Sequence, residues 1–186
     1  MTDDRKTGPS GVGTVDGSAA VEQETQWLVA LSGLPGVGKS TVAGYVTERL
    51  DATRLRTDVV RKELFDDPEY TESETEAVYR ELSDRAGECL AAGGSVVLDA
   101  TFAETQYRTP VRELAESYGA TFHLLRVVCE QSVAERRIAG RDDVSDADIP
   151  VYRRFREEFE PIESDHAVID NSGSKAETRA QVDELL

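Results

Sequence analysis

Short apolar runs alternate along the chain with longer stretches in which apolar residues recur every three or four positions. The short runs are typical of buried β-strands, and the periodic stretches are typical of amphipathic helices. Strands are predicted at residues 27–31, 53–58, 95–101, 122–129 and 166–170. Helices are predicted at 39–50, 59–65, 73–90, from Tyr107 to Tyr118, and at 131–139, 151–159 and 175–186. This alternation predicts an α/β fold in three layers, with a five-stranded, mainly parallel sheet between helices.

The apolar content of each strand predicts its place in the sheet. Residues 95–101 are apolar almost throughout, which is typical of a central parallel strand, whereas residues 53–58 are weakly apolar and favour a position near an edge. Ser73 and Glu76 have the spacing of a capping box at the start of a helix.

The first 24 residues differ in composition from the rest of the chain. Residues 1–24 are rich in Gly, Ser, Thr and Asp and lack apolar periodicity, so we expect a disordered leader before a single domain over residues 25–186. No apolar run approaches the roughly 20 residues of a membrane span, and the first residues lack a signal-peptide pattern. Cys89 and Cys129 have no metal-like spacing. We therefore expect a cytoplasmic protein with reduced thiols, no membrane partner and no evident obligate protein partner.

The charge of the chain is strongly acidic. Among 186 residues, 37 Asp and Glu oppose 21 Lys and Arg, which gives a net charge of −16. Such a surface is typical of proteins that stay soluble in concentrated salt, where repulsion is screened, so a halophile-like source is expected. It also argues against a long nucleic acid as the substrate, because that partner favours a basic track.

One stretch has the pattern G-x-x-x-x-G-K-S of a phosphate-binding P-loop, between a predicted strand and a predicted helix. Its glycines let backbone N–H groups surround phosphate oxygens, and the helix N-terminus adds a positive dipole end. The motif predicts that Lys39 reaches the β- and γ-phosphates and that Ser40 binds Mg²⁺. The predicted nucleotide-binding residues are Gly33, Leu34, Pro35, Gly36, Val37, Gly38, Lys39, Ser40 and Thr41.

Four further features accompany the P-loop: the segment from Arg56 to Phe65 after the second strand, Asp99-Ala100-Thr101 at the end of the third, Arg137 and Arg141 beside a polar loop, and Asp170-Asn171-Ser172 after the last strand. No Asn-Lys-x-Asp motif is present, which argues against a GTPase switch. Over about residues 27–171 the chain resembles a family of small P-loop kinases related to polynucleotide 5′-kinases, zeta toxins, chloramphenicol phosphotransferases and gluconate kinases. The resemblance implies a P-loop NTPase fold like that of nucleotide kinases, with a short lid, and ATP and Mg²⁺ as cofactors.

The resemblance assigns roles on the acceptor side. Asp58 matches the residue that takes the proton of the attacking hydroxyl, and Arg61 matches an arginine that helps to hold the acceptor, as Thr101 could. Asp99 ends an apolar strand and could hold Mg²⁺ together with Ser40. The sequence leaves open the reverse assignment of Asp58 and Asp99, and it also leaves open that either carboxylate only caps a helix.

Lid arginines in the relatives close over the transferred phosphate, a role that the resemblance implies for Arg137 and Arg141. Asn171 occupies the position at which the chain of related kinases runs beside the adenine. The acidic lid sequence weakens the case for a nucleotide acceptor. We expect an ATP- and Mg²⁺-dependent phosphotransferase that acts on a hydroxyl of a small molecule. The alternatives are a polynucleotide or nucleoside 5′-kinase and a non-catalytic ATP-binding regulator.

Overall fold

The computed structural model describes residues 25–140 and 149–186. Its central sheet contains β1 (Trp27–Ser32), β2 (Thr53–Arg56), β3 (Val96–Asp99), β4 (Thr121–Val128) and β5 (Ala167–Asp170). The strands lie in the order β2-β3-β1-β4-β5 and every pairing is parallel. The predicted five-stranded sheet is confirmed, with β3 beside the central strand β1 and β2 at an edge.

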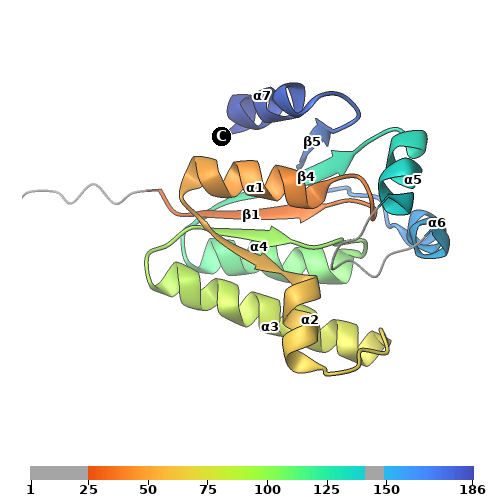
Figure 1. Cartoon of the computed structure of the whole chain (residues 1–186). Helices are drawn as coiled ribbons and strands as arrows, with labels where there is room; N and C mark the ends of the chain where they lie inside the picture. Colours follow the sequence, from red (N-terminus) through yellow and green to blue (C-terminus); the bar gives the residue numbers. More distant parts are fainter. Residues whose placement is uncertain (1–24, 141–148) are drawn as a thin grey trace, which may run out of the picture.

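Helices cover both faces of the sheet (Figure 1). One face carries α1 (Lys39–Leu50) and α7 (Lys175–Leu185), and the other carries α2 (Thr57–Leu64), α3 (Glu72–Ala91) and α4 (Thr105–Ser117). The helices α5 (Gln131–Ala139) and α6 (Ile149–Glu158) lie toward the ends of the β1 and β4 arrows. This arrangement confirms the predicted three-layer α/β architecture.

The side chains of β1 alternate between two cores. Leu28 and Ala30 pack into the cluster under α3 and α4, whereas Val29 and Leu31 pack into the cluster under α1 and α7. All four are fully buried. Because successive strand residues point to opposite faces, a strand covered on both sides must be apolar throughout, as this one is.

The boundary between β2 and α2 differs from the prediction. The strand ends at Arg56, and Thr57 and Asp58 already belong to α2. Asp58 is therefore the second residue of the helix and lies in its first turn, where a negative charge favours the positive end of the helix dipole. The prediction that residues 57 and 58 close a strand was wrong, but the position of Asp58 at this edge of the sheet is unchanged.

The predicted capping box of Ser73 and Glu76 is also wrong. The N-cap of α3 is Thr71, whose hydroxyl accepts a hydrogen bond from the Glu74 N–H at 3.3 Å. The carboxylate of Glu74 accepts hydrogen bonds from the backbone N–H groups of Glu69 and Tyr70. The sequence offers two overlapping Ser/Thr-x-x-Glu patterns, and the contacts of Glu74 favour the earlier one.

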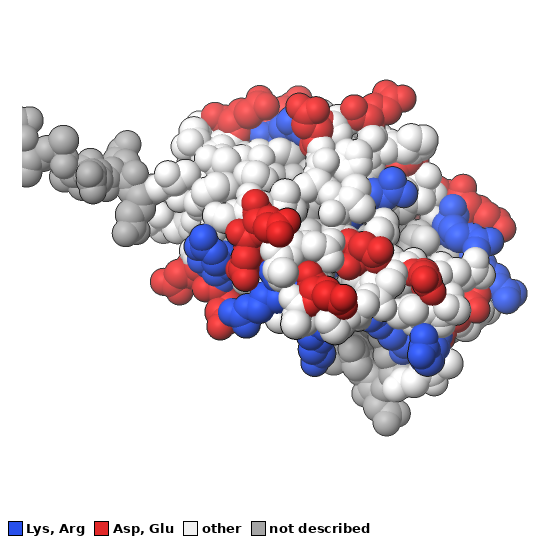
Figure 2. Space-filling model, turned by 90° about the horizontal axis from the view of Figure 1, so that it is seen from above, with Lys and Arg blue, Asp and Glu red and all other residues white. Residues whose placement is uncertain are grey.

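Two expectations fall outside the described residues: the disordered leader at 1–24, and the lid loop at 141–148 with Arg141. Within residues 25–140 and 149–186, no helix has both the length and the apolar character that crossing a bilayer requires. On the face shown in Figure 2, Lys and Arg side chains are scattered among Asp and Glu rather than joined in a continuous basic track.

Candidate active site

The P-loop connects the central strand β1 to α1 at the carboxyl edge of the sheet. Its conformation depends on glycine at Gly36 and Gly38, whose φ angles are 82° and 90°. An ideal Cβ on Gly38 would lie 2.1 Å from the Asn171 side-chain nitrogen. Because L side chains rarely adopt this region and the space is occupied, only glycine fits here. The loop is thus built as the motif predicts.

The Lys39 side chain folds back over the loop. Its ammonium donates to the carbonyl oxygens of Gly33 at 2.8 Å and Leu34 at 3.0 Å. Lys39 is also the first residue of α1, so its charge adds to the positive end of that helix. This combination of a cation, a helix N-terminus and a glycine loop is suited to the phosphates of a nucleotide.

The back of the P-loop is held by residues from three other elements. The carbonyl of Val37 accepts hydrogen bonds from Asn171 Nδ2 at 2.8 Å and from Arg137 Nη1 at 3.2 Å. Asn171 Oδ1 in turn accepts from the Thr178 hydroxyl at 2.8 Å. Asn171 is 4% exposed, and its amide supports the loop from inside the protein. Arg137 also donates to the Asn171 carbonyl, so it supports the loop in the same way.

Ser40 and Asp99 meet, although 59 positions separate them. The Ser40 hydroxyl donates to Asp99 Oδ2 at 2.9 Å, because β3 lies directly beside β1. Arg54 on β2 donates to the same carboxylate oxygen. The described residues contain no group of three or more His, Cys, Asp or Glu that could hold a metal ion alone. A hydroxyl and a carboxylate are, however, the oxygen donors that suit Mg²⁺, which commonly takes its other ligands from phosphates and water. The residues present therefore fit a Mg²⁺ ion.

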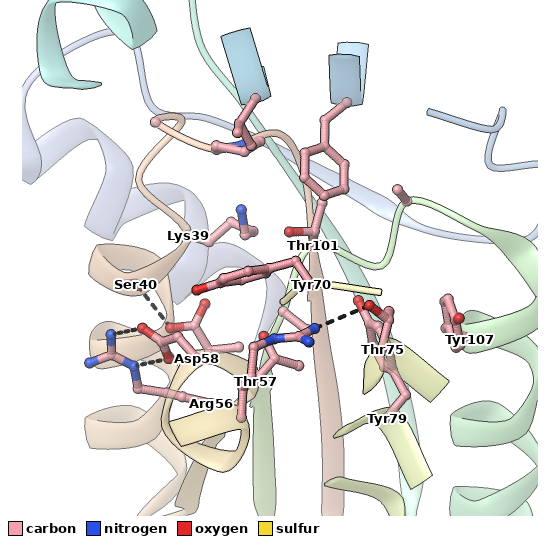
Figure 3. Close-up of a pocket in the computed structure, with 18 of the residues that line it drawn as sticks. Lys39, Ser40, Arg56, Thr57, Asp58, Tyr70, Thr75, Tyr79, Thr101 and Tyr107 are labelled. Atoms are coloured by element: carbon pink, nitrogen blue, oxygen red, sulfur yellow. Dashed lines mark hydrogen bonds and ion pairs between the residues drawn. The ribbon is translucent and has the colours of Figure 1, made fainter. Parts of the chain in front are cut away.

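Beside this pair, a cavity of about 500 Å³ opens along the edge of the sheet. It is lined by P-loop residues, by the start of α2, by α3 and by the β3–α4 connection, with α6 adding Val151, Arg154 and Phe155. Figure 3 shows Lys39, Ser40, Asp58 and Thr101 around it, together with Tyr70, Tyr79 and Tyr107. The three tyrosines and Phe155 lack a recognisable motif and were not predicted as site residues.

Asp58 lines the cavity and forms an ion pair with Arg56 (Figure 3). Arg56 Nε donates to Asp58 Oδ1 at 3.0 Å, and Arg56 Nη2 donates to Oδ2. The Val59 N–H donates to Oδ1 as well. This bidentate geometry fixes the plane of the carboxylate. Arg56 was not predicted as a site residue, although a basic residue two positions before a candidate base was visible in the sequence.

Arg61 also lines the cavity but is mostly occupied within the protein. It is 8% exposed, donates to Glu74 at 3.3 Å and to the Thr75 hydroxyl at 3.2 Å, and lies 4.7 Å from the centre of the Tyr70 ring. The backbone N–H groups of Glu69 and Tyr70 donate to the same Glu74 carboxylate and, with the charge of Arg61, lower its pKa. Glu74 thus joins Arg61 to the loop that carries Tyr70.

The connection after β3 closes the cavity. The Thr101 carbonyl accepts from the Gly33 N–H at 3.1 Å, which ties this connection to the P-loop. Tyr79 packs face to face on Tyr107 at 4.0 Å, and its hydroxyl accepts from the Phe102 N–H at 3.0 Å. Burial raises the pKa of Tyr79, so its hydroxyl stays protonated and can donate a hydrogen bond.

Most of the chain, including this site, matches a known family. A family model described as an AAA domain (AAA_33) matches residues 28–162. An uncharacterised protein of Mycobacterium tuberculosis is 31% identical over 140 residues, which make up 68% of this chain and 28% of that protein. The chain therefore spans less than a third of the length of this curated relative.

Solved kinase structures share the fold. The APS kinase CysC of Mycobacterium tuberculosis, in complex with AMPPNP and APS, has a TM-score of 0.67 and 21% identity, over 87% of this chain and 97% of that one. A sugar kinase from Janibacter sp. HTCC2649 has a TM-score of 0.67 and 17% identity, over 86% and 92%. At these identities the likeness concerns the fold. On the strength of the family match, the chain belongs to the AAA-domain family AAA_33, and it has the α/β fold of P-loop kinases.

Proposed function

We propose that this protein is an ATP- and Mg²⁺-dependent phosphotransferase that transfers the γ-phosphate to a hydroxyl of a small molecule. One observation carries the proposal: the P-loop and the Asp58 carboxylate open into the same cavity. A phosphoryl donor and an acceptor hydroxyl bound there would lie next to each other, as in-line transfer requires.

On the donor side, the loop from Gly33 to Thr41 binds the triphosphate through its N–H groups, and Lys39 neutralises the β- and γ-phosphates. Ser40 and Asp99 would hold the Mg²⁺ ion, which, when bound, offsets the charge that develops on the phosphate oxygens. Arg54 keeps the Asp99 carboxylate in place for this task. Arg137 holds the Val37 carbonyl by a hydrogen bond. A lid role for Arg137 and Arg141 remains a prediction, and so does a contact of Asn171 with adenine.

On the acceptor side, Asp58 orients the hydroxyl and receives its proton. Asp58 Oδ2 accepts a hydrogen bond from Arg56, and a carboxylate oxygen has a second lone pair with which it can accept from a hydroxyl in the cavity. Arg56 holds the carboxylate in one orientation before the acceptor hydroxyl binds. Thr101 and the wall around Arg61 complete the acceptor side.

Two further observations support a small acceptor. The named structural relatives are an APS kinase and a sugar kinase, whose names give small molecules as substrates. The face in Figure 2 shows no continuous basic track for a long polyanion. A cytoplasmic location is part of the proposal.

Asp58→Asn tests the proposal, with the exposed Asp84→Asn on α3 as the matched control. We expect Asp58→Asn to lower phosphate transfer from ATP by about 100-fold or more, because asparagine cannot take the proton. Nucleotide affinity should stay unchanged. The assay follows labelled γ-phosphate into a metabolite extract and identifies the product by mass.

Undiminished transfer by Asp58→Asn would remove Asp58 from the role of base. Label appearing on a 5′-OH oligonucleotide instead of a metabolite would favour a polynucleotide kinase. Tight ATP binding without any phosphorylated product would favour a non-catalytic regulator.

A further inference from the structure

We infer that the acceptor is a neutral or amine-bearing hydroxyl compound with a flat ring, and that it carries no phosphate, sulfate or carboxylate group. The inference rests on the proposed function and names the substrate class of the same cavity. Three sets of contacts around the acceptor end support it.

The arginines on this side of the cavity already have carboxylate partners. Arg61 pairs with Glu74 and is covered by the Tyr70 ring, and Arg56 makes a bidentate pair with Asp58. Arg54, next to the cavity, pairs with Asp99. An anionic acceptor would have to compete with these carboxylates. The side chains of Arg61 and Glu74 are only 10% and 13% exposed, and stripping one partner from such a largely buried pair is strongly destabilising.

One more arginine lines the cavity, from α6. The side chain of this residue, Arg154, is 58% exposed and lies 3.8 Å from Glu158. An exposed charge with a carboxylate neighbour is a weak ligand for a second anion. Lys39 serves the donor phosphates in the proposed function.

The acceptor end also carries negative charge. Glu104 lines the cavity, and its carboxylate accepts a hydrogen bond from the neutral Gln106 side chain. Burial raises the pKa of Tyr107, and the negative charges of Glu104, Glu76 and Glu72 raise it further. Arg61 acts in the opposite direction on the pKa of Tyr107, but the three carboxylates outnumber it. A surplus of negative charge beside the cavity disfavours an anionic acceptor and favours an ammonium group.

Aromatic and hydroxyl side chains form the remaining wall. Tyr70, Tyr79 and Tyr107 present ring surface, and Thr57, Thr75 and Thr101 present hydroxyl groups. Ring faces bind flat apolar surfaces, such as the C–H face of a sugar or an aromatic ring, and threonine hydroxyls orient such a ligand. An amine would also lie favourably against these rings.

The test separates a cell-metabolite extract on ion-exchange resins at neutral pH into anionic, neutral and cationic fractions. Each fraction is incubated with the full chain, Mg²⁺ and γ-labelled ATP, and labelled products are identified by mass. In parallel, compounds retained by the chain in the presence of ADP are identified from each fraction. We expect product and retained compounds from the neutral or cationic fraction.

Product from the anionic fraction would overturn the inference while leaving the proposed phosphotransferase intact. If no fraction yields product, the proposed function fails, and the retained compounds decide the inference alone. Retention of anionic compounds, or of no compound, would then overturn it.

A charge variant provides a second measurement that does not depend on the unknown acceptor. Tyrosol, tyramine and 4-hydroxyphenylacetate share one ring and differ in charge, and their binding is followed by ligand-observed NMR. We expect Glu104→Gln to reduce the preference for tyramine over 4-hydroxyphenylacetate by about tenfold. Glu116→Gln, at an exposed position of α4, the helix that follows Glu104, should leave the preference unchanged. An equal preference in wild type and Glu104→Gln would contradict the inference.

Discussion

Gly38 illustrates how one residue meets two separate demands. Its backbone has a φ of 90°, where a Cβ is strained, and the space beside it is filled by the Asn171 amide. Gly93, at the end of α3, has nearly the same φ of 87°, but a Cβ there would meet nothing within 4 Å. The two glycines therefore share the strain and differ in the contact.

This pair gives a controlled substitution. We expect Gly93→Ala to lower the free energy of unfolding by about 1–2 kcal/mol from backbone strain alone. Gly38→Ala should cost about 1–3 kcal/mol more, because the new methyl group displaces Asn171. Urea unfolding of both variants measures the difference. Equal losses of free energy would mean that the Asn171 side chain moves aside without destabilising the protein.

Arg61 shows where residue-level prediction reached its limit. Its spacing from Asp58 was visible in the sequence, but its burial against Glu74, Thr75 and Tyr70 was not. Those partners lie 9 to 14 positions away, and none forms a motif with it. The charge that an arginine offers a ligand depends on such partners.

Helix α7 is the element that links the C-terminal part of the chain to the P-loop. Its Thr178 is fully buried and donates to Asn171, whose amide holds the Val37 carbonyl. The helix begins with a capping box of Ser174 and Glu177, which fixes the start of the helix and so the position of Thr178. This link carries no motif and was not predicted.

Thr178→Val tests the link, because it keeps the shape and removes the hydroxyl. We expect a loss of about 1–3 kcal/mol in the free energy of unfolding, since Asn171 Oδ1 is left buried without its donor. ATP affinity should also fall, because the Val37 peptide loses its orientation. Thr178→Ser keeps the hydroxyl and should retain most of the affinity. Loss of stability with unchanged ATP affinity would show that the link does not reach the P-loop.

At the scale of the whole molecule, the net charge of −16 acts on stability. Several arginines make ion pairs, but Asp and Glu outnumber Lys and Arg by 16, so repulsion among carboxylates opposes the compact state. Salt weakens that repulsion, and the Debye length falls from about 10 Å at 0.1 M to about 3 Å at 1 M.

We therefore expect the free energy of unfolding to rise as KCl increases from about 0.1 to 1 M, the range over which screening becomes strong. Urea unfolding at each salt concentration measures the trend. Glu113→Gln and Glu116→Gln, at exposed positions of α4, reduce the net charge and should flatten it. A free energy that falls with KCl would show that the ion pairs outweigh the repulsion.

The sequence by itself determined the layers of the fold and the place of the P-loop between β1 and α1. Both depend on local patterns: apolar runs of strand length, helical periodicity, and a glycine-rich motif between a strand and a helix. The tertiary structure alone decided which distant residues meet at the site, because parallel strands far apart in the chain end at one edge and bring Ser40 to Asp99 and Thr101 to Gly33. It also decided which charges remain available there. Ion pairs such as Arg61 with Glu74 form between separate helices, and no local pattern encodes them.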